Sequence, residues 1–137
     1  MRVRTAALGA ALTAVVAAGT ACEPAMEITV NVSRDIVLLP DEHAGQTGST
    51  LLFRGQAWCT RSEPIDLWIT VDGSRADGTS IPCDGPEGND WTVSETFPQR
   101  FEPGNAAVSW LACTNPGEVV DEDCVTASRA NSEIRAK

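Results

Sequence analysis

Cysteines are the residues whose chemistry this sequence indicates most directly. Four of the five are Cys59, Cys83, Cys113 and Cys124. In an oxidising compartment four thiols form two disulfides, in more than one arrangement. We favour Cys59–Cys83 with Cys113–Cys124, because each pair joins nearby segments. The main alternative is an immunoglobulin-style bridge, Cys59–Cys113, which would put Trp68 near that fold's core tryptophan. Each bridge is expected to stabilise the fold by about 2–4 kcal/mol.

The first segment of the chain has the pattern of an export signal. Arg2 and Arg4 precede an uncharged, Ala-rich stretch that is too short for a bilayer-spanning helix and that ends in small residues. We therefore expect residues 1–21 to be a cleaved signal peptide. A short tether at 22–27 and one domain at 28–134 would follow.

The fifth cysteine, Cys22, is a candidate lipidation site. The run Gly19-Thr20-Ala21-Cys22 resembles a bacterial lipobox, although Gly19 stands where Leu, Val or Ala is usual. A diacylglycerol on Cys22 would then be the membrane attachment of this chain. The alternative is ordinary cleavage nearby, which would leave Cys22 as a free thiol or remove it.

The other polar candidates predict no metal site and no catalysis. His43 is the only histidine and lies in Asp41-Glu42-His43, whose neighbouring side chains rarely converge on one ion. The acidic run at 121–123 lacks the alternating pattern of a calcium loop. No nucleophile signature accompanies the lone histidine. We therefore expect no cofactor, no metal and no enzyme activity.

Tryptophans are the remaining candidates for a binding site. The chain has four Trp and no Tyr. Strand alternation would turn Trp58, Trp68 and Trp110 outward if Cys59, Leu67 and Cys113 face the core. Three outward tryptophans would form a candidate binding face for a sugar or a protein. The alternative reading buries one or more of them in the core, as is usual for large aromatic side chains.

Short alternating runs separated by Gly, Pro, Asp and Asn predict an all-β chain. They indicate about seven or eight strands, the signature of an antiparallel β-sandwich. The segments expected to be strands are 27–32, 36–39, 50–60, 65–71, the edge-like 79–83, 91–97, 106–113 and 124–134.

Several motifs together resemble a family of small exported bacterial domains of unknown function. The motifs are Ala57-Trp58-Cys59, Cys83-Asp84-Gly85, Trp91 and Phe101-Glu102-Pro103-Gly104-Asn105-Ala106, followed by Cys113 and Cys124. The resemblance covers residues 50–134. It implies an immunoglobulin-like antiparallel β-sandwich and the disulfides Cys59–Cys83 and Cys113–Cys124. It implies no reaction.

Composition limits the function classes that remain. The chain has 137 residues, 19 acidic and 10 basic, with a net charge of −9. This balance argues against nucleic acid as a partner, because that role usually needs a basic stripe. We expect a non-enzymatic interaction or binding module that is secreted or anchored to the outer face of the cell membrane. Its partner would be an extracellular protein or a glycan. The rivals are a secreted small-ligand or glycan-binding module and a secreted protease inhibitor that presents the loop 115–123.

Overall fold

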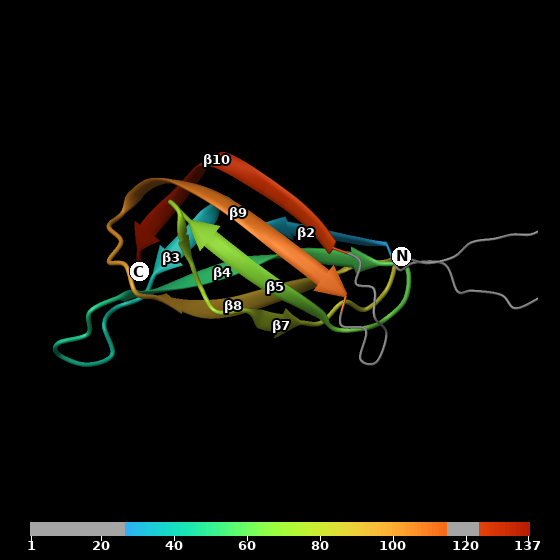
Figure 1. Ribbon diagram of the computed structural model, residues 1–137, viewed down its shortest axis with the longest axis horizontal. Coiled ribbons are helices and arrows are strands. Elements are labelled where there is room, and N and C mark those ends of the chain that lie inside the picture. Colours follow the sequence, from blue (N-terminus) through green and yellow to red (C-terminus); the bar gives the residue numbers. More distant parts are fainter. Residues whose placement is uncertain (1–26, 115–123) are drawn as a thin grey trace, which may run out of the picture.

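The computed structural model describes residues 27–114 and 124–137, and these residues form strands, turns and loops without a helix (Figure 1). The expected signal peptide, Cys22 and the loop 115–123 lie outside the described residues. The strands are β2 (Ile28–Val32), β3 (Asp35–Leu38), β4 (Ser49–Cys59), β5 (Ile65–Val71), β6 (Ser74–Arg75), β7 (Thr79–Ile81), β8 (Asn89–Phe97), β9 (Gly104–Thr114) and β10 (Cys124–Ala136).

Alternation of apolar and polar residues explains where the strands form. In β2, Ile28, Val30 and Val32 are buried while the residues between them are exposed. In β5 every second residue from Ile65 to Val71 is buried, and the others are half-buried. Each such strand presents one apolar face, which must be covered by another layer. The prediction of an all-β chain from this alternation is confirmed.

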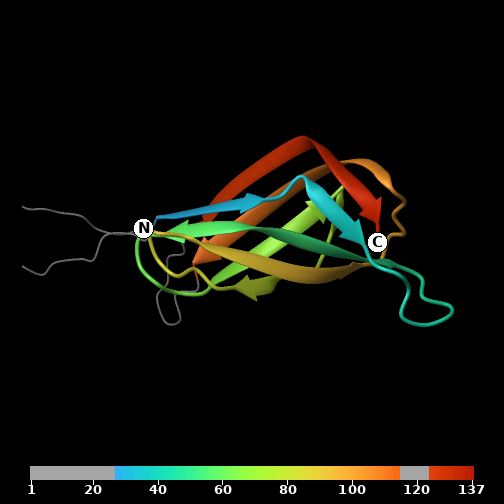
Figure 2. The same cartoon turned by 180° about the vertical axis from the view of Figure 1, so that it is seen from behind.

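The strands form an immunoglobulin-like β-sandwich of two layers (Figures 1 and 2). β4 pairs antiparallel with β2 and β8, and these strands make one layer. β9 pairs antiparallel with β10 and β5, and these strands make the other layer. The short strands β6 and β7 pair with the free edge of β5. The expected position of the Pro82 segment at a sheet edge agrees with this pairing.

β3 joins the two layers along one side of the sandwich. Leu38 is paired antiparallel with Leu51 of β4. The same strand runs parallel to the end of β10, where Ile36 is opposite Ile134. Hydrogen bonding is therefore continuous from one layer to the other through β3. This parallel pairing departs from the purely antiparallel sheet that the sequence predicts.

A bulge in β10 changes which of its side chains face inward. The register of β10 against β9 shifts between Arg129 and Ser132. Before the shift the odd-numbered residues face the other layer, and after it the even-numbered Ser132 and Ile134 are buried. An extra residue in one strand produces this switch of faces. The bulge lets one strand pack Ile134 in the core and leave Ser128 on the outer face.

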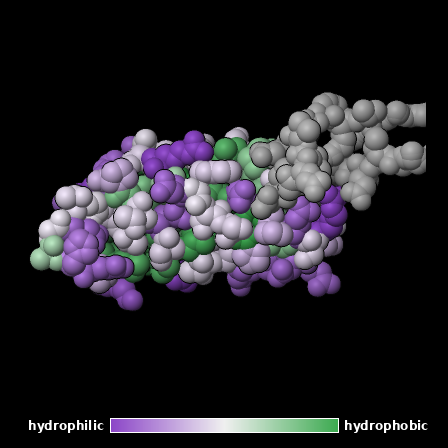
Figure 3. Space-filling view, turned by 60° about the horizontal axis from the view of Figure 1, so that its bottom comes forward, coloured by the Kyte–Doolittle hydropathy of each residue, from purple (hydrophilic) through white to green (hydrophobic). Residues whose placement is uncertain are grey.

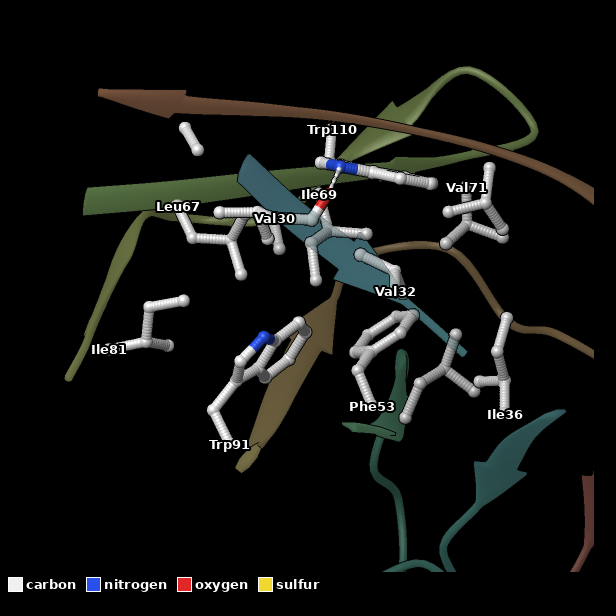
Figure 4. Close-up of a cluster of buried hydrophobic side chains, with 14 of the residues drawn as sticks. Val30, Val32, Ile36, Phe53, Leu67, Ile69, Val71, Ile81, Trp91 and Trp110 are labelled. Carbon is white, nitrogen blue, oxygen red and sulfur yellow. Dashed lines mark hydrogen bonds between the residues drawn. The ribbon is translucent and has the colours of Figure 1, made fainter. Parts of the chain in front are cut away.

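Aromatic rings from both layers fill the core (Figure 4). Phe97 contacts Phe53 and Phe101 edge-to-face, with ring centroids 6.1 and 5.3 Å away. Trp91 of β8 is 3% exposed and lies opposite Gly55 in the register of β4. A Cβ at Gly55 would lie 2.6 Å from the Trp91 ring, so glycine provides the space for the indole.

The structure contains both of the favoured disulfides. Cys59 is bonded to Cys83 and Cys113 to Cys124. The immunoglobulin-style bridge from Cys59 to Cys113 is therefore not formed. Cys113 and Cys124 are directly opposite each other on β9 and β10. Two disulfides in a domain of this size are typical of an oxidising, extracytoplasmic environment.

Candidate functional site

The candidate face of three tryptophans does not form, and the alternative reading, which buries one or more of them, holds for Trp110. Trp58 lies on β4 and Trp68 on β5, so the two half-buried side chains point outward from opposite layers of the sandwich. Trp110 is only 6% exposed and belongs to the core. Alternation within a strand predicts which residues share a face, but it does not say which layer the strand joins.

Trp110 faces inward because β9 has the opposite phase from the one that the candidate face of three tryptophans requires. Its inward row carries Val108, Trp110 and Ala112, which pack against β5. The Trp110 indole N–H donates a 3.0 Å hydrogen bond to the carbonyl oxygen of Val30 in the other layer (Figure 4). Cys113 lies on the opposite row of β9 from Trp110, is 3% exposed and has Cys124 as its direct neighbour. The polar Ser109 was the sequence signal that could have identified the correct phase.

The outer face of the β5–β9–β10 layer carries Trp68, whose half-buried side chain borders a hollow of the described surface. Trp68 is in register with Leu111 of β9, which is in register with Thr126 of β10. The next row across the sheet consists of Thr70, Ser109 and Ser128, and we call these three residues the hydroxyl row. Arg75 of β6 lies at its end.

Two adjoining hollows follow the hydroxyl row. The first has a volume of about 410 Å³ and is bounded by Trp68 and Arg75. The second has a volume of about 350 Å³ and extends toward Arg129. Both are lined by Thr70, Ser109 and Ser128. The hollows form because small side chains lie beside an indole and a long guanidinium side chain. We call them together the outer groove.

Trp68 is held in place by two neighbours. The guanidinium carbon of Arg75 lies 5.6 Å from the centroid of the Trp68 ring, within the range of a cation–π contact. Gly78 lies against the same indole, because a Cβ there would be 2.3 Å from the Trp68 Nε1 atom. Trp58 has an equivalent neighbour in Gly88 on the other layer. The Trp68–Arg75 pair is therefore a preformed part of the groove wall.

Arg129 borders the second hollow, but its guanidinium turns away from the outer groove and is engaged by the protein. Its guanidinium donates hydrogen bonds to the carbonyl oxygen of Val32 and to the side chain of Asn31. It also lies 5.5 Å from the centroid of the Trp110 ring. These contacts join β10 to β2 across the open side of the sandwich. Arg75 is exposed, and within the described residues it has no ion-pair partner.

The charge of the outer groove differs from that of the whole protein. The net charge is −9, yet among the described residues that line either hollow there is no Asp or Glu. Figure 3 shows the face that lies at the bottom of Figure 1, near β7 and β8. On this face hydrophilic and near-neutral residues surround small apolar areas. The groove is thus a hydroxyl-lined strip with one accessible cation on an acidic, polar protein.

The other polar residues singled out from the sequence lie elsewhere. His43 is in the exposed loop after β3, where its Nδ1 lies 3.2 Å from the Ala44 carbonyl oxygen. The Asp41 carboxylate accepts a 2.9 Å hydrogen bond from Arg100. No cluster of His, Cys, Asp or Glu able to hold a metal ion occurs in residues 27–114 and 124–137. Nor does any helix in these two ranges have the length and apolarity to cross a membrane.

Glu95 is a buried ionisable residue that the sequence analysis did not single out. It lies on the inward row of β8, opposite Leu51, and is 8% exposed. Burial raises the pKa of the Glu95 carboxyl, and the charge of Asp77 raises it further. Glu95 lies outside the two hollows of the outer groove, so its role concerns stability rather than that site.

Comparisons with known proteins give no family for this chain. No protein-family model and no curated protein matches it. Among solved structures, it is similar to the CARDB domain of a Pyrococcus furiosus protein in complex with di-metal ions. The TM-score is 0.41 at 10% sequence identity, over 81% of this chain and 93% of that one. A likeness at this level assigns no ligand, so function must be argued from the outer groove.

Proposed function

We propose that this protein is an exported, non-enzymatic binding module that acts at or outside the cell surface. Two disulfides, Cys59–Cys83 and Cys113–Cys124, support an oxidising location. The signal-like start of the chain, residues 1–21, supports export. The module would be diffusible or, with a lipid on Cys22, anchored to the membrane.

The outer groove is the observation that carries the proposal. It runs across three strands of a disulfide-braced sheet, so its side chains keep their spacing without a ligand. The side chains that it presents are the Trp68 indole, the Arg75 guanidinium, hydroxyls and apolar side chains. Hydroxyl and guanidinium groups bind by hydrogen bonding. The lining therefore supports recognition rather than acid–base or nucleophilic catalysis.

Retention on cell envelopes tests the binding function. The variant Ser109→Gln fills the middle of the outer groove with an uncharged side chain. Because Ser109 lines both hollows, we expect it to lower the fraction of protein retained by bacterial envelope fractions about tenfold, the effect of about 1.4 kcal/mol. The measurement is co-sedimentation of the exported mature protein with washed envelopes.

A matched variant on the other layer controls for surface effects. Ser94→Gln makes the same change on the exposed face of β8, opposite Leu52. We expect its retention to equal that of the wild type. Equal retention of both variants, or no retention of the wild-type protein, would contradict the proposed function.

The export part of the proposal has its own test. Intact mass and non-reducing peptide mapping of protein from a bacterial exporting host will show where the chain is cleaved and whether Cys22 carries a diacylglycerol. Cleavage near residue 21 is expected. A chain that keeps its first residues and stays in the cytoplasm would contradict export.

A further inference from the structure

The hydroxyl row matches the polar pattern of a sugar. Thr70, Ser109 and Ser128 lie on adjacent strands, and neighbouring strands are about 4.8 Å apart. Each hydroxyl both donates and accepts a hydrogen bond, as sugar hydroxyls do. The row can therefore satisfy several hydroxyls of one ligand along a line. The apolar walls, Leu111 and Trp68, suit the C–H surfaces of sugar rings.

Arg75 adds a fixed positive group at one end of the row. A guanidinium that lies over an aromatic ring keeps the N–H groups at its edge available, and that edge matches a carboxylate in bidentate geometry. Trp68 positions Arg75 in this way, and no described carboxylate is paired with it. The cation is therefore free to bind an anionic group of a ligand.

The overall negative charge does not prevent such a contact. Fields of exposed charges are screened over about 8 Å at physiological ionic strength. Within the described lining of both hollows, arginine is the only charged residue type. The described lining of the first hollow, which Arg75 borders, is therefore positive and complementary to an anionic ligand that carries hydroxyls.

We propose that the outer groove binds an acidic saccharide, a sugar chain whose rings carry carboxylates. Arg75 binds a carboxylate, and Thr70, Ser109 and Ser128 bind ring hydroxyls. The inference rests on the proposed binding function and names the ligand class of the same site. A second copy of this acidic chain fits the groove less well, because two like-charged molecules would have to approach. An acidic peptide offers the charge but not the row of hydroxyls.

Titration calorimetry with three probes tests the ligand class on the exported mature protein. Trigalacturonate carries both carboxylates and hydroxyls, maltotriose carries only hydroxyls, and triglutamate carries only carboxylates. We expect trigalacturonate to bind at least about tenfold more tightly than either of the others, the effect of losing one charge-assisted hydrogen bond. Equal or tighter binding of maltotriose or triglutamate, or no binding of trigalacturonate, would overturn the proposal.

Two arginine variants locate the site. Arg75→Gln is expected to weaken trigalacturonate binding about tenfold or more, because the bidentate contact is lost. Arg54→Gln removes an exposed arginine from the opposite layer and is expected to leave the affinity within about twofold. Ser109→Ala keeps the groove open and should weaken binding about threefold through one lost hydrogen bond. Equal losses in the two arginine variants would overturn the assignment to the outer groove.

The experiments distinguish a wrong ligand class from a wrong binding function. If Ser109→Gln lowers envelope retention while trigalacturonate does not bind, the groove binds another ligand and only the saccharide inference is wrong. If the wild-type protein is not retained and no probe binds, both are wrong.

Discussion

Single residues on the inward rows decide where this sandwich is sensitive to change. Glu95 is a carboxyl group in a row that also contains Phe97 and Trp91. Because burial raises its pKa, the folded protein binds a proton at Glu95 more tightly than the unfolded chain does. The resulting stabilisation is present at low pH and is lost as the pH rises through the folded-state pKa.

Glu95→Gln is therefore expected to stabilise the protein at pH 7. The amide cannot ionise, so the variant avoids the desolvation of a buried charge and the repulsion from Asp77. The advantage over the wild type should shrink as the pH falls, because the wild-type carboxyl takes up its proton at a higher pH than in the unfolded chain. Urea unfolding at several pH values measures this. A variant less stable than the wild type at pH 7 would contradict the account.

An added methyl group is expected to lower the free energy of unfolding by different amounts at two glycines, Gly55 and Gly78. A Cβ at Gly55 would lie 1.8 Å from the backbone oxygen of Asn31, which the paired strand holds in place. We expect Gly55→Ala to lower the free energy of unfolding by about 3 kcal/mol. In Gly78→Ala the conflict is with the half-buried ring of Trp68, which can shift, so the loss should be smaller. Equal losses in urea unfolding would show that strand pairing does not restrict Gly55.

At the scale of elements, Trp110 joins β9 to β2 of the other layer. Trp110→Phe would leave the Val30 carbonyl without its indole donor, at an expected cost of about 1–3 kcal/mol. Hydrogen exchange of the β2 amides should accelerate more than that of β4. Trp58→Phe, on an outer face, is the matched control and should have a smaller effect. Unchanged exchange in β2 would contradict the role of Trp110.

The two disulfides are expected to open in a defined order under mild reductant. Cys59 and Cys83 are 2% and 1% exposed, whereas Cys124 is exposed. Thiol–disulfide exchange needs access to a sulfur, so the Cys113–Cys124 bond should open first. Differential alkylation followed by peptide mapping measures the order. Earlier labelling of Cys59 would contradict it.

The positions of most strands along the chain were predictable from alternation, and the failures of that prediction have physical causes. Ile28–Val32 and Ile65–Val71 have a clear period of two and were expected as strands. β9 has apolar residues in both phases, so the sequence left open which face Trp110 lies on. The bulge in β10 breaks the period and reverses the faces between Arg129 and Ser132.

The outer groove depends on pairings that the sequence does not contain as a local pattern. Thr70, Ser109 and Ser128 come from three strands, and only the register of the folded sheet places them in one row. The contact of Arg75 with Trp68 similarly requires β6 to fold back on β5. The sequence alone indicated Trp68 as a binding residue but gave no reason to separate it from Trp58.

At the scale of the whole molecule, β3 and the end of β10 close the sandwich and hold the strand that carries Ser128. Ile134 and Ile36 are paired there and are 2% and 0% exposed. Ile134→Ala should lower the free energy of unfolding by about 2–5 kcal/mol, because it leaves a cavity where the layers meet. Arg135→Ala changes the exposed residue next to Ile134 and should lower the free energy of unfolding by no more than about 0.5 kcal/mol.

The same pair of variants tests whether the two layers unfold together. Because hydrogen bonding continues through β3, a loss at Ile134 should lower the unfolding midpoint of both layers equally. Trp91 reports on the β2–β4–β8 layer and Trp68 on the β5–β9–β10 layer, so fluorescence of single-tryptophan versions separates the two. Coincident transitions in Ile134→Ala are expected. Separate transitions would mean that each layer is stable by itself and that β3 does not couple the two layers. The outer groove would then keep its geometry when the opposite layer unfolds.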